Sequence, residues 1–88
     1  MIYLDPFRDS GKRIGRAGPS WSHLCGTSLQ ELHLFAARIG LQRRWFQDSV
    51  KHPHYDIGSV RIRALALALG AIEVSSERLV QIAASTER

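Results

Sequence analysis

The spacing of apolar residues predicts helices and strands in alternation, and its clearest signal is a helix near the middle of the chain. Apolar positions recur with the period of one helix face over residues 29–39. Ser28 stands at capping-box spacing from Glu31, with Thr27 as a competing cap. Gly40 then follows as a stop signal. We therefore expect a helix that begins at residue 28 or 29 and ends before Gly40.

Two further helices are predicted in the second half of the chain. Residues 59–70 join a short alternating stretch to a run of alanine and leucine, which are strong helix formers, and a glycine ends the run. Ser59 or Asp56 can cap this helix. A last helix opens at Ser75 or Ser76, and its apolar stripe comprises Leu79, Val80, Ile82 and Ala83.

Three short segments are predicted as strands, namely residues 2–4, 43–47 and 71–74. The pair Asp5-Pro6 stops the first strand, because proline cannot donate to a ladder. Residues 6–27 show neither a strand period nor a helix period and are predicted to form a long loop, functional or partly mobile. Residues 52–56 are predicted to form a second loop, because a proline disfavours helix at the residue before it.

The resulting order is β-α-β-α-β-α within a single domain, residues 1–88. Such alternation implies a parallel sheet that is covered by helices and joined by right-handed crossovers. The sequence therefore predicts a minimal α/β fold with a three-stranded parallel sheet. So small a core also favours a homodimer.

Composition and charge narrow the choice of partners. The 88 residues hold 12 Lys plus Arg against 8 Asp plus Glu, a net charge of +4, and ten of the basic residues lie in 1–63. A basic face attracts phosphate, nucleic acid or an acidic protein, although a merely solvated surface gives the same count. One cysteine, no leader and no apolar stretch of membrane length predict a soluble cytoplasmic protein without membrane contact.

Reactive side chains converge on one edge of the predicted sheet. Ligands of open α/β sheets bind beyond the carboxyl ends of the strands. Asp5 leaves the first strand at that edge, and the loop that holds His23 begins there. The loop with His54, Tyr55 and Asp56 follows the second strand. These five residues form the candidate catalytic site, in which His23 or His54 would act as general acid or base.

Imidazoles and carboxylates together can also hold a metal ion; no metal site is predicted, and the candidates for one are His23, His54 and Asp5. Loop histidines equally serve as hydrogen-bonding or acid/base groups, and no HExxH or CxxC pair supports a metal. Asp5 has an ordinary structural interpretation as the cap of a turn, and Asp56 as the cap of the second helix.

Basic and aromatic residues complete the candidate site. Arg8, Arg43 and Arg44 could hold a phosphate or carboxylate, and Trp21 could stack on a base. Three other residues are predicted to be structural rather than functional: Trp45 in the core, His33 beside an apolar stripe, and Cys25 as an incidental thiol.

The chain resembles a known family over nearly its whole length. The motifs that carry the resemblance are Tyr3-x-Asp5-Pro6, Trp21-Ser22-His23-Leu24, residues 28–36, Trp45-Phe46, His54-Tyr55-Asp56 and residues 70–75. They are similar to the domain-of-unknown-function family 4031 (DUF4031), single-domain proteins of bacteria and their phages. The resemblance implies no activity, but it singles out Asp5, Trp21, His23, His54, Tyr55 and Asp56. His52 and the glycine-rich segment with Lys12 and Arg13 lie outside its motifs.

Two functions from different classes are consistent with these patterns. The first is a His/Tyr/Asp site that binds a phosphorylated ligand, a nucleotide or a nucleic-acid end, and hydrolyses a phosphoester, with a divalent metal as an optional cofactor. The alternative is a non-enzymatic accessory or phage–host interaction module, in which the basic loop 8–16 binds nucleic acid or an acidic protein.

Overall fold

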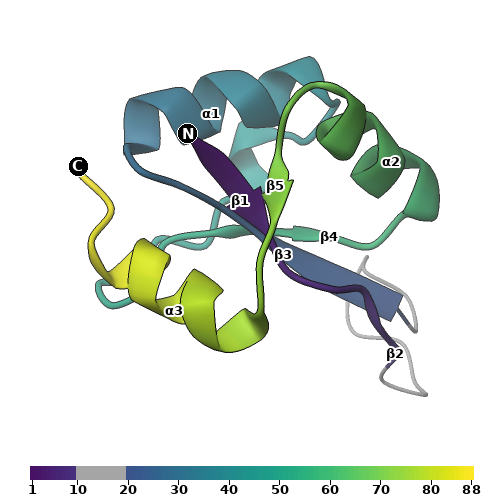
Figure 1. Ribbon diagram of the computed structural model, residues 1–88. Coiled ribbons are helices and arrows are strands. Elements are labelled where there is room, and N and C mark those ends of the chain that lie inside the picture. Colours follow the sequence, from purple (N-terminus) through teal and green to yellow (C-terminus); the bar gives the residue numbers. More distant parts are fainter. Residues whose placement is uncertain (10–19) are drawn as a thin grey trace.

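A small mixed sheet with helices on both faces forms the centre of the molecule (Figure 1). The computed structural model describes residues 1–9 and 20–88. The sheet has five strands, and their bounds are β1 Ile2–Leu4, β2 Arg8–Asp9, β3 Ser20–Gly26, β4 Tyr55–Ile57 and β5 Ile72–Glu73. The helices are α1 Leu29–Arg38, the 3-10 turn η1 Arg43–Trp45, α2 Val60–Ala68 and α3 Ser76–Ala84.

The prediction of a three-stranded parallel sheet is wrong both in the direction of the strands and in their number. β3 runs antiparallel to β1, β2 and β4, and only β1 and β5 are parallel. The α/β class is confirmed, because α1 and α2 pack on one face of the sheet and α3 on the other.

The sheet differs from the prediction because its longest strand lies inside the predicted loop 6–27. β3 contains two serines, a histidine and a glycine, residue types that strand propensity disfavours or leaves neutral. It is covered on both faces, so Leu24 and Cys25 are both buried and the strand shows no apolar alternation. Long-range pairing, rather than local preference, therefore defines this strand.

Two other segments differ from the prediction: a predicted strand is a 3-10 turn, and part of a predicted loop is a strand. Residues 43–47 do not form a strand: η1 occupies Arg43–Trp45, and Trp45 packs against the core. The predicted loop 52–56 instead leads into β4, where Tyr55 and Ile57 are fully buried. Asp56 consequently lies within a strand and does not cap α2.

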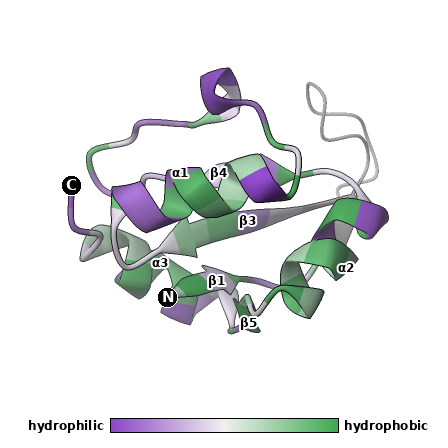
Figure 2. Cartoon of the chain, turned by 90° about the horizontal axis from the view of Figure 1, so that it is seen from above, coloured by the Kyte–Doolittle hydropathy of each residue, from purple (hydrophilic) through white to green (hydrophobic). Residues whose placement is uncertain are grey.

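The three predicted helices are confirmed together with their local signals. Ser28, Ser59 and Ser75 cap α1, α2 and α3, and each side chain accepts a backbone hydrogen bond from the first turn. Gly40 and Gly70 have φ values of 90° and 107°, the left-handed conformation that glycine adopts at helix ends. In Figure 2, α2 is hydrophobic over most of its length, as its alanine and leucine content predicts.

Alternation along the strands divides the side chains between two layers. Leu4, Leu24, Tyr55 and Ile57 point to the layer of α1 and α2 and join its core cluster. Tyr3 and Cys25 point to the opposite face and pack with Leu79 and Ala83 of α3. The candidate site is formed by polar residues on this same face, under α3.

Candidate functional site

Three strands place polar side chains together on the α3 face of the sheet. Asp5 directly follows β1, His23 lies within β3, and Asp56 lies within β4 with His54 just before it. His23 and Asp56 are direct cross-strand partners, so their side chains are neighbours on one face. The structure thus brings together four of the five predicted catalytic residues.

Asp5 is a buried carboxylate that fixes the position of His23. It is only 1% exposed, and its Oδ1 accepts the backbone N–H of His23 at 2.7 Å. Its Oδ2 lies 3.0 Å from Nδ1 of His23 and accepts a hydrogen bond from Ser76 Oγ at 2.9 Å. Because a carboxylate accepts, Nδ1 of His23 carries the proton and Nε2 holds the lone pair of the neutral ring.

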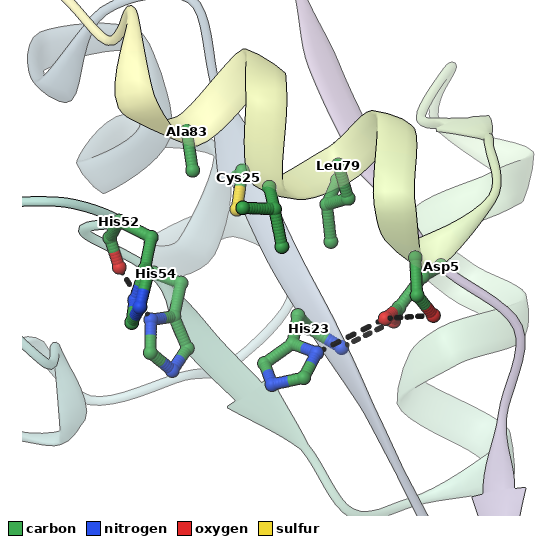
Figure 3. A pocket seen from close by; sticks show the side chains of 9 residues that line it. Asp5, His23, Cys25, His52, His54, Leu79 and Ala83 are labelled. Atoms are coloured by element: carbon green, nitrogen blue, oxygen red, sulfur yellow. Dashed lines mark hydrogen bonds and ion pairs between the residues drawn. The ribbon is translucent and has the colours of Figure 1, made fainter.

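His54 is oriented in the same manner by a backbone group. Its Nδ1 donates to the carbonyl oxygen of His52 at 2.7 Å, which leaves Nε2 as the lone-pair nitrogen of the neutral ring. The ring meets that of His23 edge-to-face, with centroids 5.0 Å apart. Figure 3 shows both imidazoles in the same pocket, with the Asp5–His23 and His52–His54 hydrogen bonds drawn as dashed lines.

Both imidazoles approach the same carboxylate oxygen of Asp56. Its Oδ1 lies 3.4 Å from Nε2 of His54 and 4.0 Å from Nε2 of His23, while Oδ2 accepts a hydrogen bond from Gln47. Among the described residues, nothing forms a hydrogen bond of ordinary geometry with the buried Oδ1. A buried carboxylate oxygen in this state is costly unless a cation or proton compensates it.

Electrostatics make the pocket attractive to positive charge. Burial raises the pKa of Asp5, but hydrogen bonds from the ring and backbone of His23 outweigh it and lower the pKa to about 2. Burial also raises the pKa of Asp56, but the ion-pair contact with His54 and the hydrogen bond from Gln47 outweigh burial and leave the pKa below its ordinary value. Both carboxylates are therefore ionised at neutral pH. Burial lowers the pKa of His54, but the contacts with Asp56 and the His52 carbonyl raise it overall.

The pocket around these groups has two contrasting sides. Its volume is about 230 Å³, and its polar side comprises Asp5, His23, His52, His54 and Ser76. Its other side is apolar and comprises Cys25 and three residues of α3: Leu79, Val80 and Ala83. Figure 3 shows α3 passing over the two imidazoles.

The donor set fits a metal ion, with one change from the candidate ligands. One ring nitrogen of His23, one of His54 and a carboxylate oxygen of Asp56 lie within 4.8 Å of one another. In both imidazoles Nε2 is the nitrogen that approaches Oδ1 of Asp56. Asp56 stands in this candidate set in place of Asp5, and Asp5 instead contacts the His23 ring from behind. A carboxylate behind a ligating histidine is a frequent arrangement in zinc sites.

The remaining predicted site residues do not join this cluster in the described structure. Tyr55 points to the opposite face, where its hydroxyl is 2.8 Å from Nδ1 of His33. Arg43 lies over the ring of Phe46, and Arg44 donates to Gln42. The side chains of Arg8 and Trp21, and Lys12 and Arg13 of the basic loop, lie outside the described residues.

Sequence reasoning missed the groups that support the cluster. Gln47, the carbonyl of His52 and the hydroxyl of Ser76 each hold one of its members. Their roles depend on contacts between distant or irregular segments. Of these three groups, only Ser76 could have been found from the sequence, because it follows the last predicted strand, and β5 in that segment is the parallel neighbour of β1. Cys25 is buried, and burial together with the charges of Asp5 and Asp56 raises the pKa of its thiol to about 12.

Replacement of Tyr55 with phenylalanine should affect stability without affecting the candidate site. We expect the free energy of unfolding to fall by about 1 kcal/mol, because Nδ1 of His33 loses its hydrogen-bond donor. Ligand binding at His23 and His54 should not change, because the lost hydroxyl is on the other face of the sheet. Urea unfolding of both proteins measures the first effect. A loss of ligand affinity in Tyr55→Phe would contradict this expectation.

His33 should contribute to the pH dependence of stability. Burial, together with the charge of Arg43, lowers its pKa in the folded protein. Below about pH 6.5 the unfolded chain then binds a proton more readily than the folded one, so stability falls as the pH drops. His33→Gln should show a smaller loss of stability between pH 7.5 and pH 5.5 than the wild type. Equal losses in urea unfolding would contradict the role of His33.

Comparison with known proteins adds a family but no activity. In the part of the chain that the structure describes, no helix has the length and apolarity needed to cross a membrane. No curated protein and no solved structure shows significant similarity to the chain. Residues 2–86 match the family described as "Protein of unknown function (DUF4031)", as the sequence motifs predicted. The chain therefore belongs to the DUF4031 family.

Proposed function

We propose that this chain is a metal-dependent hydrolase that binds one divalent transition-metal ion and cleaves a phosphoester. The ligands are Nε2 of His23, Nε2 of His54 and Oδ1 of Asp56. The observation that carries the proposal is the convergence of these three atoms around a buried carboxylate oxygen that has no hydrogen bond among the described residues. In their neutral rings both nitrogens are lone-pair donors, so a cation at their centre relieves the repulsion among three electron-rich atoms.

The identity of the ligands supports zinc or a neighbouring transition metal. Two imidazoles and one carboxylate are a frequent ligand set of catalytic zinc, which keeps a further position open for water or substrate. Calcium and magnesium prefer oxygen-rich sites and fit this set less well. Each ligand is also held from behind, by Asp5, the His52 carbonyl and Gln47 respectively, which gives the site a fixed geometry.

The reaction proposed is hydrolysis by an activated water molecule. A bound ion of this class would supply the acidity that hydrolysis needs, since it brings the pKa of a water molecule to about 7. In the overall reaction water would add to phosphorus as the ester P–O bond breaks, and the leaving alcohol would take a proton from solvent. His23, His54 and Asp56 hold the ion, and Asp5 keeps the His23 ring in the tautomer that binds it.

A phosphoester is favoured over other esters by the charge of the chain and by the need for a cation at the site. The net charge of +4 attracts anions. No lysine or arginine is among the described residues that line the pocket, so the metal ion supplies the positive charge that a phosphoryl group requires there.

Metal titration followed by a hydrolysis assay tests the proposal. Metal-free protein is titrated with Co²⁺, whose visible absorption reports coordination, and zinc is then measured by competition. We expect one ion per chain, and a loss of affinity of more than about 100-fold in His54→Ala and in Asp56→Asn. The zinc-loaded wild type should hydrolyse a 4-nitrophenyl phosphate ester, and both variants should lose that activity.

His52→Ala is the matched control, because it removes an imidazole from the pocket but keeps the carbonyl that orients His54. Its metal affinity should stay within about threefold of the wild type. Failure of the wild type to bind a transition metal would overturn the metal site. Binding without hydrolysis of any phosphoester would overturn the hydrolase. An unchanged metal affinity in Asp56→Asn would show that the ligand set is wrong.

A further inference from the structure

The apolar side of the pocket has no role in metal binding, and its position indicates what the substrate carries. Leu79, Val80 and Ala83 lie on one side of α3, and Cys25 of β3 adjoins them. We call these four residues the α3 wall. Figure 3 shows Leu79, Ala83 and Cys25 across the pocket from the rings of His23 and His54. A ligand held between the two imidazoles therefore lies against an apolar surface.

The side chains described at the pocket favour a substrate with one phosphoryl group over a polyanionic one. The described residues that line it include one carboxylate, Asp5, three histidines and the thiol of Cys25, and no lysine or arginine. One phosphoryl group could bind the metal ion directly. A second phosphate beside it would lie against Leu79 or Asp5. The neighbouring Arg63 already donates to the Asp5 carbonyl and pairs with Glu73, so burial of that second phosphate would be costly.

The size of the pocket limits the group that it can accept. Its volume of about 230 Å³ is below the usual range of roughly 300–1,000 Å³ for sites that enclose drug-sized ligands. One phosphoryl group with a single ring or short alkyl chain fits this space. A nucleoside triphosphate or an oligonucleotide would have to extend beyond it.

We infer that the α3 wall is the specificity surface of the site and binds an uncharged, apolar group next to the phosphoryl group. The substrate class is then a phosphate ester of an aryl or short alkyl alcohol, rather than a nucleoside polyphosphate. This inference rests on the proposed function, because it takes the metal ion as the phosphoryl-binding group. Val80 is the accessible part of the wall, since it is 55% exposed while Leu79 and Ala83 are each 2% exposed.

Binding of two non-hydrolysable phosphonates tests the inference without requiring catalysis. Phenylphosphonate and methylphosphonate present the same anionic head to the ion and differ only in the apolar group. In calorimetric titrations of the zinc-loaded wild type, we expect phenylphosphonate to bind at least about tenfold more tightly, because apolar contacts of this size change affinity by that order.

Val80→Gln should reduce this preference to about threefold or less and leave methylphosphonate affinity unchanged. Leu34→Gln is the matched control, because Leu34 is an exposed apolar residue of another helix, 64% exposed, that does not line the pocket. It should keep the full preference of the wild type.

The outcomes separate this inference from the proposed function. Equal affinities for the two phosphonates in the wild type would overturn the α3 wall as a specificity surface and leave the metal-dependent site intact. A preference that persists in Val80→Gln would show that the phenyl group binds elsewhere, which also overturns the inference. Failure of both phosphonates to bind zinc-loaded protein would overturn the proposed phosphoesterase, and the inference with it.

Discussion

Replacement of Asp5 with alanine should lower the free energy of unfolding by about 3–5 kcal/mol, as expected when a buried, hydrogen-bonded charge is lost. Asp5 is 1% exposed, and its carboxylate accepts hydrogen bonds from the backbone of His23 and from Ser76. Alanine leaves these donors without partners in the interior and leaves His23 without the carboxylate that orients its ring. Urea unfolding at pH 7.5 measures the change.

Two further variants show whether the carboxylate itself is responsible. Ser76→Ala removes one hydrogen bond and should cost about 1 kcal/mol. Asp5→Asn keeps the shape but directs an NH₂ group at a donor, so it should fall between Ser76→Ala and Asp5→Ala. A cost below about 1 kcal/mol for Asp5→Ala would show that Asp5 does not organise the site.

The elements that could be predicted from the sequence are those specified by neighbouring residues. The helices were predicted because their serine caps and glycine stops act within one turn. β3 could not be predicted in this way. Its Ser22 is fully buried, and the hydroxyl is satisfied there by donating to the carbonyl of Asp5 at 2.6 Å, a partner 17 residues away. A local pattern contains no trace of such a contact.

The residues of the candidate site were predicted from a sheet that is wrong, and they meet for a different reason. Asp5 does lie at the carboxyl end of β1, beside its parallel neighbour β5. His23 and Asp56 instead meet as antiparallel cross-strand partners. Strand alternation also explains Tyr55, because the residue between His54 and Asp56 must point to the other face. The sequence motif therefore names positions in two separate layers.

The structural and chemical roles of Asp5 are linked. The carboxylate that closes the contacts among β1, β3 and α3 is also the group that fixes the tautomer of His23. Selection for stability alone would permit an apolar residue at this position, since a buried polar network often stabilises no more than good packing does. A costly buried carboxylate next to a histidine is better explained by the lone pair that it leaves on Nε2.

Addition of zinc should raise the midpoint of thermal unfolding by about 10 °C or more. An ion at 100 times its dissociation constant adds about 2.7 kcal/mol to the stability of the folded state. In a domain of this size, each kcal/mol shifts the midpoint by roughly 4–8 °C. The unfolded chain lacks the site, because His23 and Asp56 come from strands that are paired only in the fold and His54 directly precedes one of them. A thermal melt of metal-free protein with and without Zn²⁺ measures the shift.

The shift should disappear in Asp56→Asn and persist in Asp48→Asn, when each variant is compared with its own metal-free form. Asp48 is the matched control, because it is an exposed carboxylate that pairs with Arg88, outside the pocket. A chelator should reverse the wild-type shift completely. An equal shift in both variants would mean that zinc binds elsewhere on the chain. No shift in the wild type would mean that the charge of Asp56 Oδ1 is balanced by a proton on His54 alone, since the contact with Asp56 raises the pKa of that imidazole.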